Sequence, residues 1–430
     1  MTIILQGPRA RLARVPLLFR ASECLDESGL YALSYGKRVA GTFTRASQKT
    51  VRDQRGRLVR VASGMPAFTV LGGQVALLLE PARTNLTRRS EAIDHAAWSK
   101  SGSPTITADA VRAPDGTLTG DLITATLDAT SCFVYQAVAF TGDGIKITGY
   151  CVRKGTAGRF TIMVRDTTAN VTRHQVLFTW TGGIPVPATV TGTGQAFVSE
   201  RLEEDWYFCH VSAAGVIAAN TNETRLYVDA PTLADTGDSL YVWGTSAEDA
   251  ATPSSYMRTE GSTVTRAADA LTIPYAVPPQ AMSLYLRGRN VGAFVDTGAS
   301  RNVLNVGSGS LGVDPRIGFQ GAAASAGFQA YYDDGATAIF VGSGVPAYRD
   351  VYEARGALSV VDAATWRLTP ELSINGAAST PGTSSTSGPA TAWPANIVRF
   401  TPQEPNAVMQ LLVALDARDM DALRSLAGVG

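Results

Sequence analysis

The residues able to do chemistry in this 430-residue chain are few and scattered. Its three histidines are His95, His174 and His210, and none lies three or four residues from another. A metal pair on a helix needs that spacing, because residues one turn apart share a face. His210 lies in an aromatic run, residues 206–210, where a hydrogen-bonded structural histidine is more common than a general base. We therefore expect no metal site and no catalytic histidine.

The four cysteines are far apart and include no Cys-x-x-Cys pair, at Cys24, Cys132, Cys151 and Cys209. A disulfide scaffold would be denser, and a zinc site would show paired ligands. We expect buried, reduced thiols that act as small hydrophobic groups.

Two acidic runs, residues 203–205 and 333–334, could suggest a glycosidase. That chemistry needs two carboxylates about 5–9.5 Å apart across a sugar-sized cleft. Neighbours on a strand point to opposite faces, so adjacency in sequence does not indicate such a pair. The Asp334–Gly335 step is also typical of a tight hairpin turn. We interpret both runs as charged turns and predict no catalytic residues.

Residues 307–312 match the Gly-x-Gly-x-x-Gly spacing of a dinucleotide loop. A phosphate-binding loop of this kind leads directly into the N-terminus of a helix. Here Pro315 follows within three residues and blocks a continuous helix. Neither a Gly-x-Ser-x-Gly nucleophile elbow nor a Walker-type phosphate loop occurs. The sequence therefore predicts no cofactor and no enzymatic activity.

Surface aromatic residues offer a different chemistry, the binding of sugars. The C–H-rich face of a pyranose packs on an aromatic ring, while nearby polar side chains fix the hydroxyl groups. Trp180, Tyr331, Tyr332 and Trp393 lie in turn-rich or loop-like surroundings and are our candidates for glycan contacts. The alternative for each is that it covers its own sheet or a subunit contact.

The elements that must position these residues are mostly strands. Apolar residues alternate with polar ones over residues 145–151, 160–164 and 282–286, which is typical of half-buried strands. Turn residues recur about every 8–15 positions, a spacing that favours antiparallel sandwiches over parallel sheets. One short helix is expected at the C-terminus, over residues 420–426. The predicted fold class is mostly β, with two antiparallel β-sandwich domains after an N-terminal region.

The composition of the chain argues against nucleic acid and membrane as its binding partners. Hydrophobic residues are 45% of the chain, which is enough to build cores, and Lys plus Arg (37) balances Asp plus Glu (37). A net charge of zero argues against a dedicated nucleic-acid binder and a polybasic membrane surface. The sequence has no uninterrupted apolar run of about 18 residues, so we expect no membrane insertion. The first 20 residues place arginines between short apolar pieces, unlike a signal peptide, so we expect none.

Two breaks in the alternation divide the chain into three parts. One lies near Asn85, after an apolar run, and the other crosses the proline-rich residues 266–279. The expected domains are residues 1–84, residues 85–268 as a first sandwich, and residues 269–430 as a second sandwich with the terminal helix.

Several motifs, in order, resemble a known family. Phe-Thr-Arg-Ala-Ser at 43–47, followed by the Leu-Leu-Leu-Glu-Pro-Ala-Arg-Thr-Asn-Leu run at 77–86, is similar to segments of tailed-phage spike and fibre proteins. Further matches to their carbohydrate-binding-module-like jelly roll lie at residues 96–100, 113–117, 204–207, 240–244 and 253–256. Residues 372–376 and the terminal helix resemble, more weakly, a concanavalin-A-like jelly roll. Similar chains occur in gene transfer agents.

The resemblance implies a non-enzymatic virion component, a head spike or tail fibre subunit, in which both sandwich domains are jelly rolls displayed for attachment to host surface polysaccharide. It also implies synthesis in the bacterial cytoplasm without a signal peptide. It implies that residues 1–84 join the particle, that the partners are other virion proteins, and that the chain is a homo-oligomer, a trimer or a pentamer. Trp98, Trp206 and Trp243 occupy matched positions and are interpreted as core markers of the fold. A purely architectural subunit and a polysaccharide depolymerase are the alternatives.

Overall fold

The computed structural model describes most of the chain. The described residues are 17–22, 25–26, 29–34, 37–274, 282–291, 301–307, 316–321, 328–333, 338–343, 346, 348–362, 365–378, 380–381, 385–387, 397–400, 406–414 and 423–424. They form two compact units, each built from separate stretches of sequence. Unit 1 combines Met1–Ala46, Ser63–Pro81 and Ala268–Gly430, and unit 2 combines Ser47–Ala62 and Ala82–Ala267.

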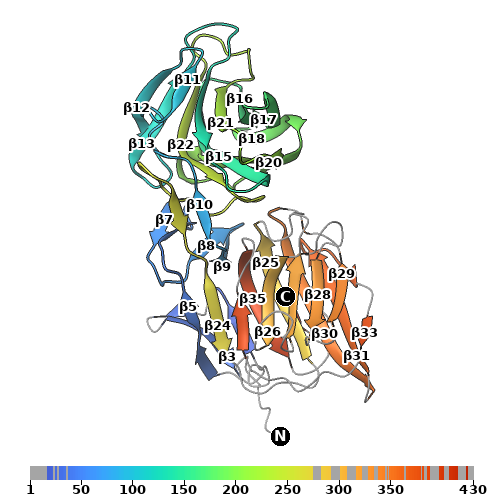
Figure 1. Cartoon of the computed structure of the whole chain (residues 1–430). Helices are drawn as coiled ribbons and strands as arrows, with labels where there is room; N and C mark the ends of the chain where they lie inside the picture. Colours follow the sequence, from blue (N-terminus) through green and yellow to red (C-terminus); the bar gives the residue numbers. More distant parts are fainter. Residues whose placement is uncertain are drawn as a thin grey trace. The chain divides into compact units, whose positions relative to one another are not determined.

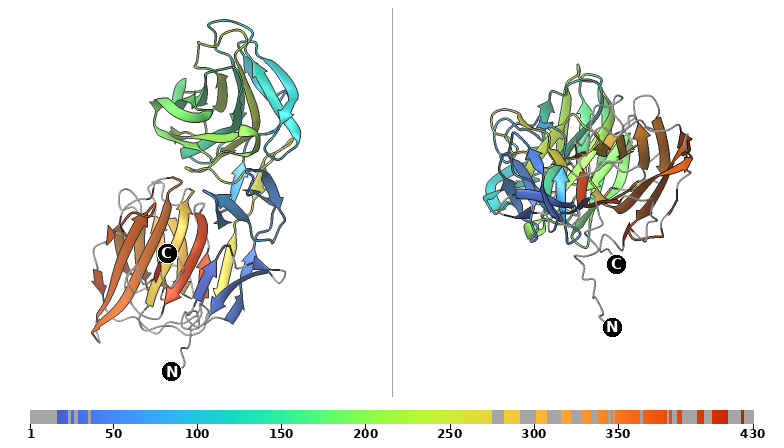
Figure 2. Two further views of the ribbon diagram at one scale, coloured as in Figure 1. Left: turned by 180° about the vertical axis from the view of Figure 1, so that it is seen from behind. Right: turned by 90° about the horizontal axis from the view of Figure 1, so that it is seen from below.

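Unit 2 is a β-sandwich of two six-stranded antiparallel sheets, drawn mainly in cyan to yellow-green in Figure 1 and seen from behind in Figure 2. The first sheet has the order β11 (Ser99–Ser101), β14 (Phe133–Val138), β21 (Asn222–Val228), β16 (Arg159–Asp166), β17 (Val171–Thr181), β18 (Ile184–Gly192). The second has the order β12 (Thr105–Arg112), β13 (Leu118–Thr124), β22 (Ser239–Glu248), β15 (Gly144–Lys154), β20 (Tyr207–Val216), β19 (Gly194–Val198).

Apolar side chains from the two sheets of unit 2 form one core. In β16, Phe160, Ile162 and Val164 are buried in this core. Thr161 and Met163, which point to the other face, are buried as well, so the strand predicted here is present but is not half-buried. Phe160 lies opposite Phe178 of β17, and their rings stack with centroids 5.0 Å apart. Cross-strand aromatic pairs of this kind stabilise a sheet by up to about 1 kcal/mol each.

Two small antiparallel strand pairs complete unit 2. β6 (Lys49–Arg52) pairs with β7 (Leu58–Val61), and β10 (Arg83–Asn85) pairs with β23 (Val264–Arg266). We call the first pair the β6–β7 hairpin. The Leu58 amide donates to the Pro114 carbonyl (2.9 Å), and the Glu203 amide donates to the Gly56 carbonyl (2.9 Å). The hairpin is therefore tied to unit 2, although about 20 residues of unit 1 separate it from β10 in sequence.

Unit 1 contains, among its described residues, a twelve-stranded and a seven-stranded sheet, both antiparallel. The twelve-stranded sheet comprises β1 (Leu17–Arg20), β2 (Leu25–Asp26), β3 (Gly29–Ser34), β4 (Lys37–Ala40), β8 (Phe68–Leu71), β9 (Gln74–Leu79), β25 (Met282–Asn290), β30 (Val351–Asp362), β31 (Thr365–Ile374), β32 (Thr380–Pro381), β33 (Ser385–Ser387) and β35 (Asn406–Ala414). The seven-stranded sheet has the order β29 (Ala338–Ser343), β28 (Phe328–Asp333), β27 (Arg316–Gly321), β26 (Arg301–Gly307), β34 (Ile397–Phe400), β24 (Ala270–Pro274), β5 (Thr42–Thr44).

The predicted mostly β, antiparallel fold class is confirmed. Of the predicted terminal helix, only Leu423 and Arg424 are described, and both are helical; its other residues lie outside the described part. Within the described residues, no helix has the length and apolar character needed to cross a bilayer.

The chain passes between the units at four junctions, residues 46–47, 62–63, 81–82 and 267–268, and the last two lie close to the expected boundaries after residues 84 and 268. Residues 1–84, in contrast, are shared between the units. β5 pairs with β24 and β9 pairs with β35 in unit 1, whereas the β6–β7 hairpin belongs to unit 2. These partners are distant in sequence, and a period-two pattern carries no information about which strand a given strand pairs with.

Candidate functional site

The glycan-contact candidates that the structure describes belong to two different units. Trp180 is half-buried on β17, where its ring centroid lies 5.3 Å from that of Phe160 and 6.4 Å from that of Tyr207, against the core of unit 2. Tyr331 and Tyr332 are consecutive residues of β28 in unit 1. Trp393 lies outside the described residues.

The interpretation of Trp98, Trp206 and Trp243 as core residues is confirmed. Their exposed fractions are 2%, 0% and 1%. Each indole also donates a hydrogen bond: Trp98 to the Arg89 carbonyl (3.0 Å), Trp206 to the Arg112 carbonyl (2.9 Å) and Trp243 to Thr119 Oγ1 (3.0 Å). A buried indole N–H needs such an acceptor.

His210 is a structural residue, as predicted. Its Nε2 lies 3.1 Å from Ser246 Oγ, and its ring stacks on Phe208 with centroids 5.6 Å apart. Burial lowers the pKa of His210 to about 4, so the imidazole is neutral at pH 7. The predicted burial of reduced thiols is likewise confirmed for Cys132, Cys151 and Cys209; Cys24 lies outside the described residues.

The first acidic run is a charged turn. Glu203–Asp205 form a 3-10 turn, and each carboxylate faces a different arginine: Glu203 faces Arg57 (4.0 Å), Glu204 faces Arg153 (3.5 Å) and Asp205 faces Arg201. In the second run, Asp333 ends β28 and Asp334 is not described. A search of the described part of the chain finds no group of three or more His, Cys, Asp or Glu residues able to hold a metal ion.

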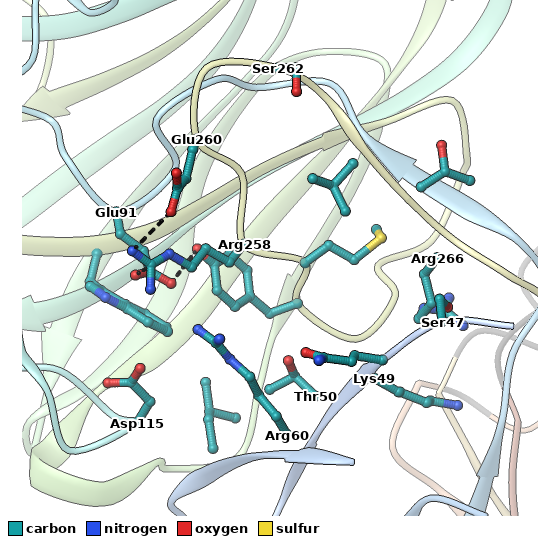
Figure 3. Close-up of a pocket in the computed structure, with 17 residues that line it drawn as sticks. Ser47, Lys49, Thr50, Arg60, Glu91, Asp115, Arg258, Glu260, Ser262 and Arg266 are labelled. Atoms are coloured by element: carbon teal, nitrogen blue, oxygen red, sulfur yellow. Dashed lines mark hydrogen bonds and ion pairs between the residues drawn. The ribbon is translucent and has the colours of Figure 1, made fainter. Parts of the chain in front are cut away.

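The structure instead brings other residues together around a cavity of about 440 Å³ in unit 2 (Figure 3). We call it the unit 2 pocket. Its wall comes from the β6–β7 hairpin, the loop after β10, the turn before β13, β22 and the segment that leads into β23. These elements contribute, in that order, Arg60, Glu91, Asp115, Trp243, and the trio Tyr256, Arg258 and Glu260. The volume falls within the ~300–1,000 Å³ usual for small-molecule sites.

Aromatic residues form the apolar side of the unit 2 pocket. The rings of Trp243 and Tyr256 lie 4.9 Å apart, and Phe208 packs behind both, at 6.4 and 5.6 Å. Leu58 of the β6–β7 hairpin belongs to the same buried cluster. This packing holds the Tyr256 ring in place, and with it the hydroxyl group that reaches Glu91.

Glu91 is the most buried acid of the pocket, at 9% exposure. Tyr256 donates a hydrogen bond to Glu91 Oε1 (3.1 Å), and Ser90 Oγ lies 2.7 Å from the same tyrosine hydroxyl. Arg258 Nε lies 3.3 Å from Glu91 Oε2. Burial raises the pKa of Glu91 above its ordinary value, and the Arg258 charge and the Tyr256 hydrogen bond oppose that rise.

The rim of the pocket is polar and charged. Arg258, whose side chain is 44% exposed, also pairs with the exposed Glu260 (3.5 Å). Asp115 Oδ1 accepts hydrogen bonds from the Thr117 amide (2.9 Å) and hydroxyl (2.5 Å). Arg60 projects from β7 into the space between these groups (Figure 3).

Taken together, the pocket offers fixed cations, carboxylate acceptors and an aromatic side. Guanidinium and carboxylate groups hydrogen-bond to hydroxyl groups, and aromatic surface packs on apolar C–H groups. This combination suits a small, highly hydroxylated ligand.

Of the pocket residues, sequence reasoning singled out only Trp243, and as a core marker. Asp115 lies in a motif that carried the resemblance, but no spacing connects it with Glu91, Arg60 or Arg258. These residues lie together because the β6–β7 hairpin packs on the rest of unit 2, which begins about 20 residues later in the sequence.

No protein-family model matches this chain, and a comparison with curated proteins gives no match.

Proposed function

We propose that this chain is a non-enzymatic attachment protein that binds a saccharide of a bacterial surface through the unit 2 pocket. In this proposal it is a spike or fibre subunit of a tailed phage or phage-like particle, present in several copies and joined to other virion proteins. Its motifs resemble those proteins, and the unit 2 pocket is the observation that supports saccharide binding.

The pocket residues suit recognition by contact. The rings of Trp243 and Tyr256 are fixed by packing, and the carboxylate of Glu91 is fixed by Tyr256 and Arg258. A site held rigid before binding loses little conformational entropy when the ligand enters. One pocket of this size binds weakly, but many copies on one particle multiply the avidity by roughly 10²-fold or more.

A depolymerase uses one carboxyl as an acid and a second as a base or nucleophile. Glu91 Oε1 accepts a hydrogen bond from Tyr256, and Oε2, which accepts none from the described residues, forms an ion pair with Arg258. This arrangement favours a positioning role for Glu91 over proton transfer to a leaving group. A purely architectural subunit would not need a pocket of this kind, since it binds no ligand.

The test is adsorption of the labelled full chain to bacterial cells before and after their surface polysaccharide is removed. We expect loss of binding on removal, and weaker binding with Tyr256→Ala, which removes one of the two aromatic rings that line the pocket. Equal binding to both cell preparations would favour the architectural alternative. New reducing ends in the polysaccharide after incubation with the protein would favour the depolymerase.

A further inference from the structure

The charges of the unit 2 pocket narrow the class of saccharide. We propose that the pocket selects a sugar that bears a carboxylate, and that Arg60 binds that carboxylate. This inference rests on the proposed function and names its ligand class.

Most charges of the pocket are already engaged within the protein. Glu91 and Glu260 face Arg258, and the Asp115 carboxylate accepts two hydrogen bonds from Thr117. Two further cations line the pocket, Lys49 and Arg266, but they are 2% and 1% exposed and have interaction partners within the protein.

Arg60 differs from these residues. It is exposed, and its guanidinium makes no hydrogen bond or ion pair with any residue that the structure describes. It lies near enough to Glu91 to oppose, weakly, the rise in the pKa of Glu91 that burial causes. Because Arg258 occupies Glu91, however, Arg60 is left to face the cavity (Figure 3).

An exposed guanidinium at the mouth of a cavity is suited to an anion that enters the cavity. Its planar fork of N–H donors matches the two oxygens of a carboxylate, in a bidentate pair stronger than a neutral hydrogen bond. The carboxylates of Asp115 and Glu260 on the rim would repel an anionic sugar bound in other orientations. They would therefore direct its carboxylate toward Arg60 and its hydroxyl groups toward themselves.

One uncommitted cation matches one negative charge. A phosphate or sulfate ester would bring more oxygens than a single guanidinium fork can pair. We therefore assign the pocket to a uronic-acid type of sugar, in which the carboxylate is part of the sugar itself and the ring can reach the aromatic side.

The experiment measures binding of the full chain to extracellular polysaccharide purified from cells that adsorb it, before and after chemical reduction of its carboxyl groups. We expect carboxyl reduction to weaken binding by about 10- to 100-fold, the range for loss of a charged hydrogen-bonded pair. Arg60→Ala should weaken binding to the native polymer by a similar factor and leave binding to the reduced polymer unchanged.

Arg55→Ala is the matched control. Arg55 is an exposed arginine in the turn of the same β6–β7 hairpin and does not line the pocket. It should bind the native polymer like the parent chain, and thermal unfolding should show that both variants are folded. If native and reduced polymers bind equally, or Arg55→Ala and Arg60→Ala lose the same affinity, the carboxylate assignment is wrong while saccharide binding stands. If no polysaccharide binds at all, both proposals are wrong.

Discussion

At the scale of single residues, the buried ionisable groups of unit 2 link its stability to pH. The folded pKa of His210, about 4, lies below the ordinary value of 6.5. Between these values the unfolded chain binds a proton that the folded chain does not, so stability falls as pH falls through this window. The lowered pKa of His174 acts in the same direction.

We predict that His210→Gln makes the free energy of unfolding less dependent on pH between 4.5 and 6.5, by up to about 1.4 kcal/mol per pH unit. Asp121 has the opposite effect on the pH dependence, because burial raises its pKa from 3.8 to about 6. Between these values the folded chain binds a proton that the unfolded chain does not, so this group adds stability as pH falls and partly offsets the effect of His210. Asp121→Asn should therefore make the dependence on pH steeper. Urea unfolding at several pH values measures both slopes, and parallel curves for all three proteins would contradict this account.

The buried His210 ring also fills the space beside Gly149, where a larger residue would place its Cβ atom. A Cβ atom at Gly149 would lie 2.1 Å from His210 Cδ2, and the ring cannot move freely because it is buried. We expect Gly149→Ala to destabilise unit 2 by about 1–3 kcal/mol. In a His210→Ala background the cost of Gly149→Ala should largely disappear, since the clash is gone.

Gly158→Ala is the control for that pair, because a Cβ atom there meets nothing within 4 Å. Chemical unfolding of the parent chain, the two single variants Gly149→Ala and His210→Ala, and the double variant completes the double-mutant cycle. Additive effects of the Gly149 and His210 changes would show that this contact does not require the glycine.

At the scale of elements, alternation of apolar and polar residues predicts where strands lie, even though β15 and β16 are buried on both faces. The period-two pattern at residues 145–151, 160–164 and 282–286 corresponds to β15, β16 and β25. The β6–β7 hairpin shows why partners are not predictable. Its residues were expected with residues 1–84, yet Leu58 packs in an aromatic cluster of unit 2 and Arg60 reaches the pocket. Neither contact leaves a local signal in the sequence.

The β6–β7 hairpin should become less stable when Leu58, which packs it on unit 2, is truncated. Leu58 is 8% exposed in the cluster with Trp243 and Tyr256, so we expect Leu58→Ala to destabilise unit 2 by about 2–4 kcal/mol. Hydrogen exchange should quicken in the amides of β6 and β7 and remain slow in β16, within the main core. Val59→Ala, on the opposite face of β7, is the control, and equal exchange in both variants would argue against this anchoring role.

At the scale of the whole molecule, the division into units predicts which fragment of unit 2 is stable. Residues 85–268, the domain expected from sequence, keep both six-stranded sheets but lack the β6–β7 hairpin and all of β10 except Asn85. Such a fragment exposes the aromatic cluster that Leu58 helps to cover and loses two backbone hydrogen bonds, from the Leu58 amide to Pro114 and from the Glu203 amide to Gly56.

A fragment of residues 47–267 restores the hairpin and these contacts. We therefore expect it to unfold at a higher temperature than residues 85–268, by several degrees, since burial of one leucine alone contributes about 1.5–3 kcal/mol. Circular dichroism melting of the two fragments measures the difference. Adding Leu58→Ala to the longer fragment should remove most of the gain, which separates the contribution of the hairpin from that of added length. Equal melting temperatures would mean that the sandwich is complete without the hairpin, and the pocket wall would then be a dispensable addition to it.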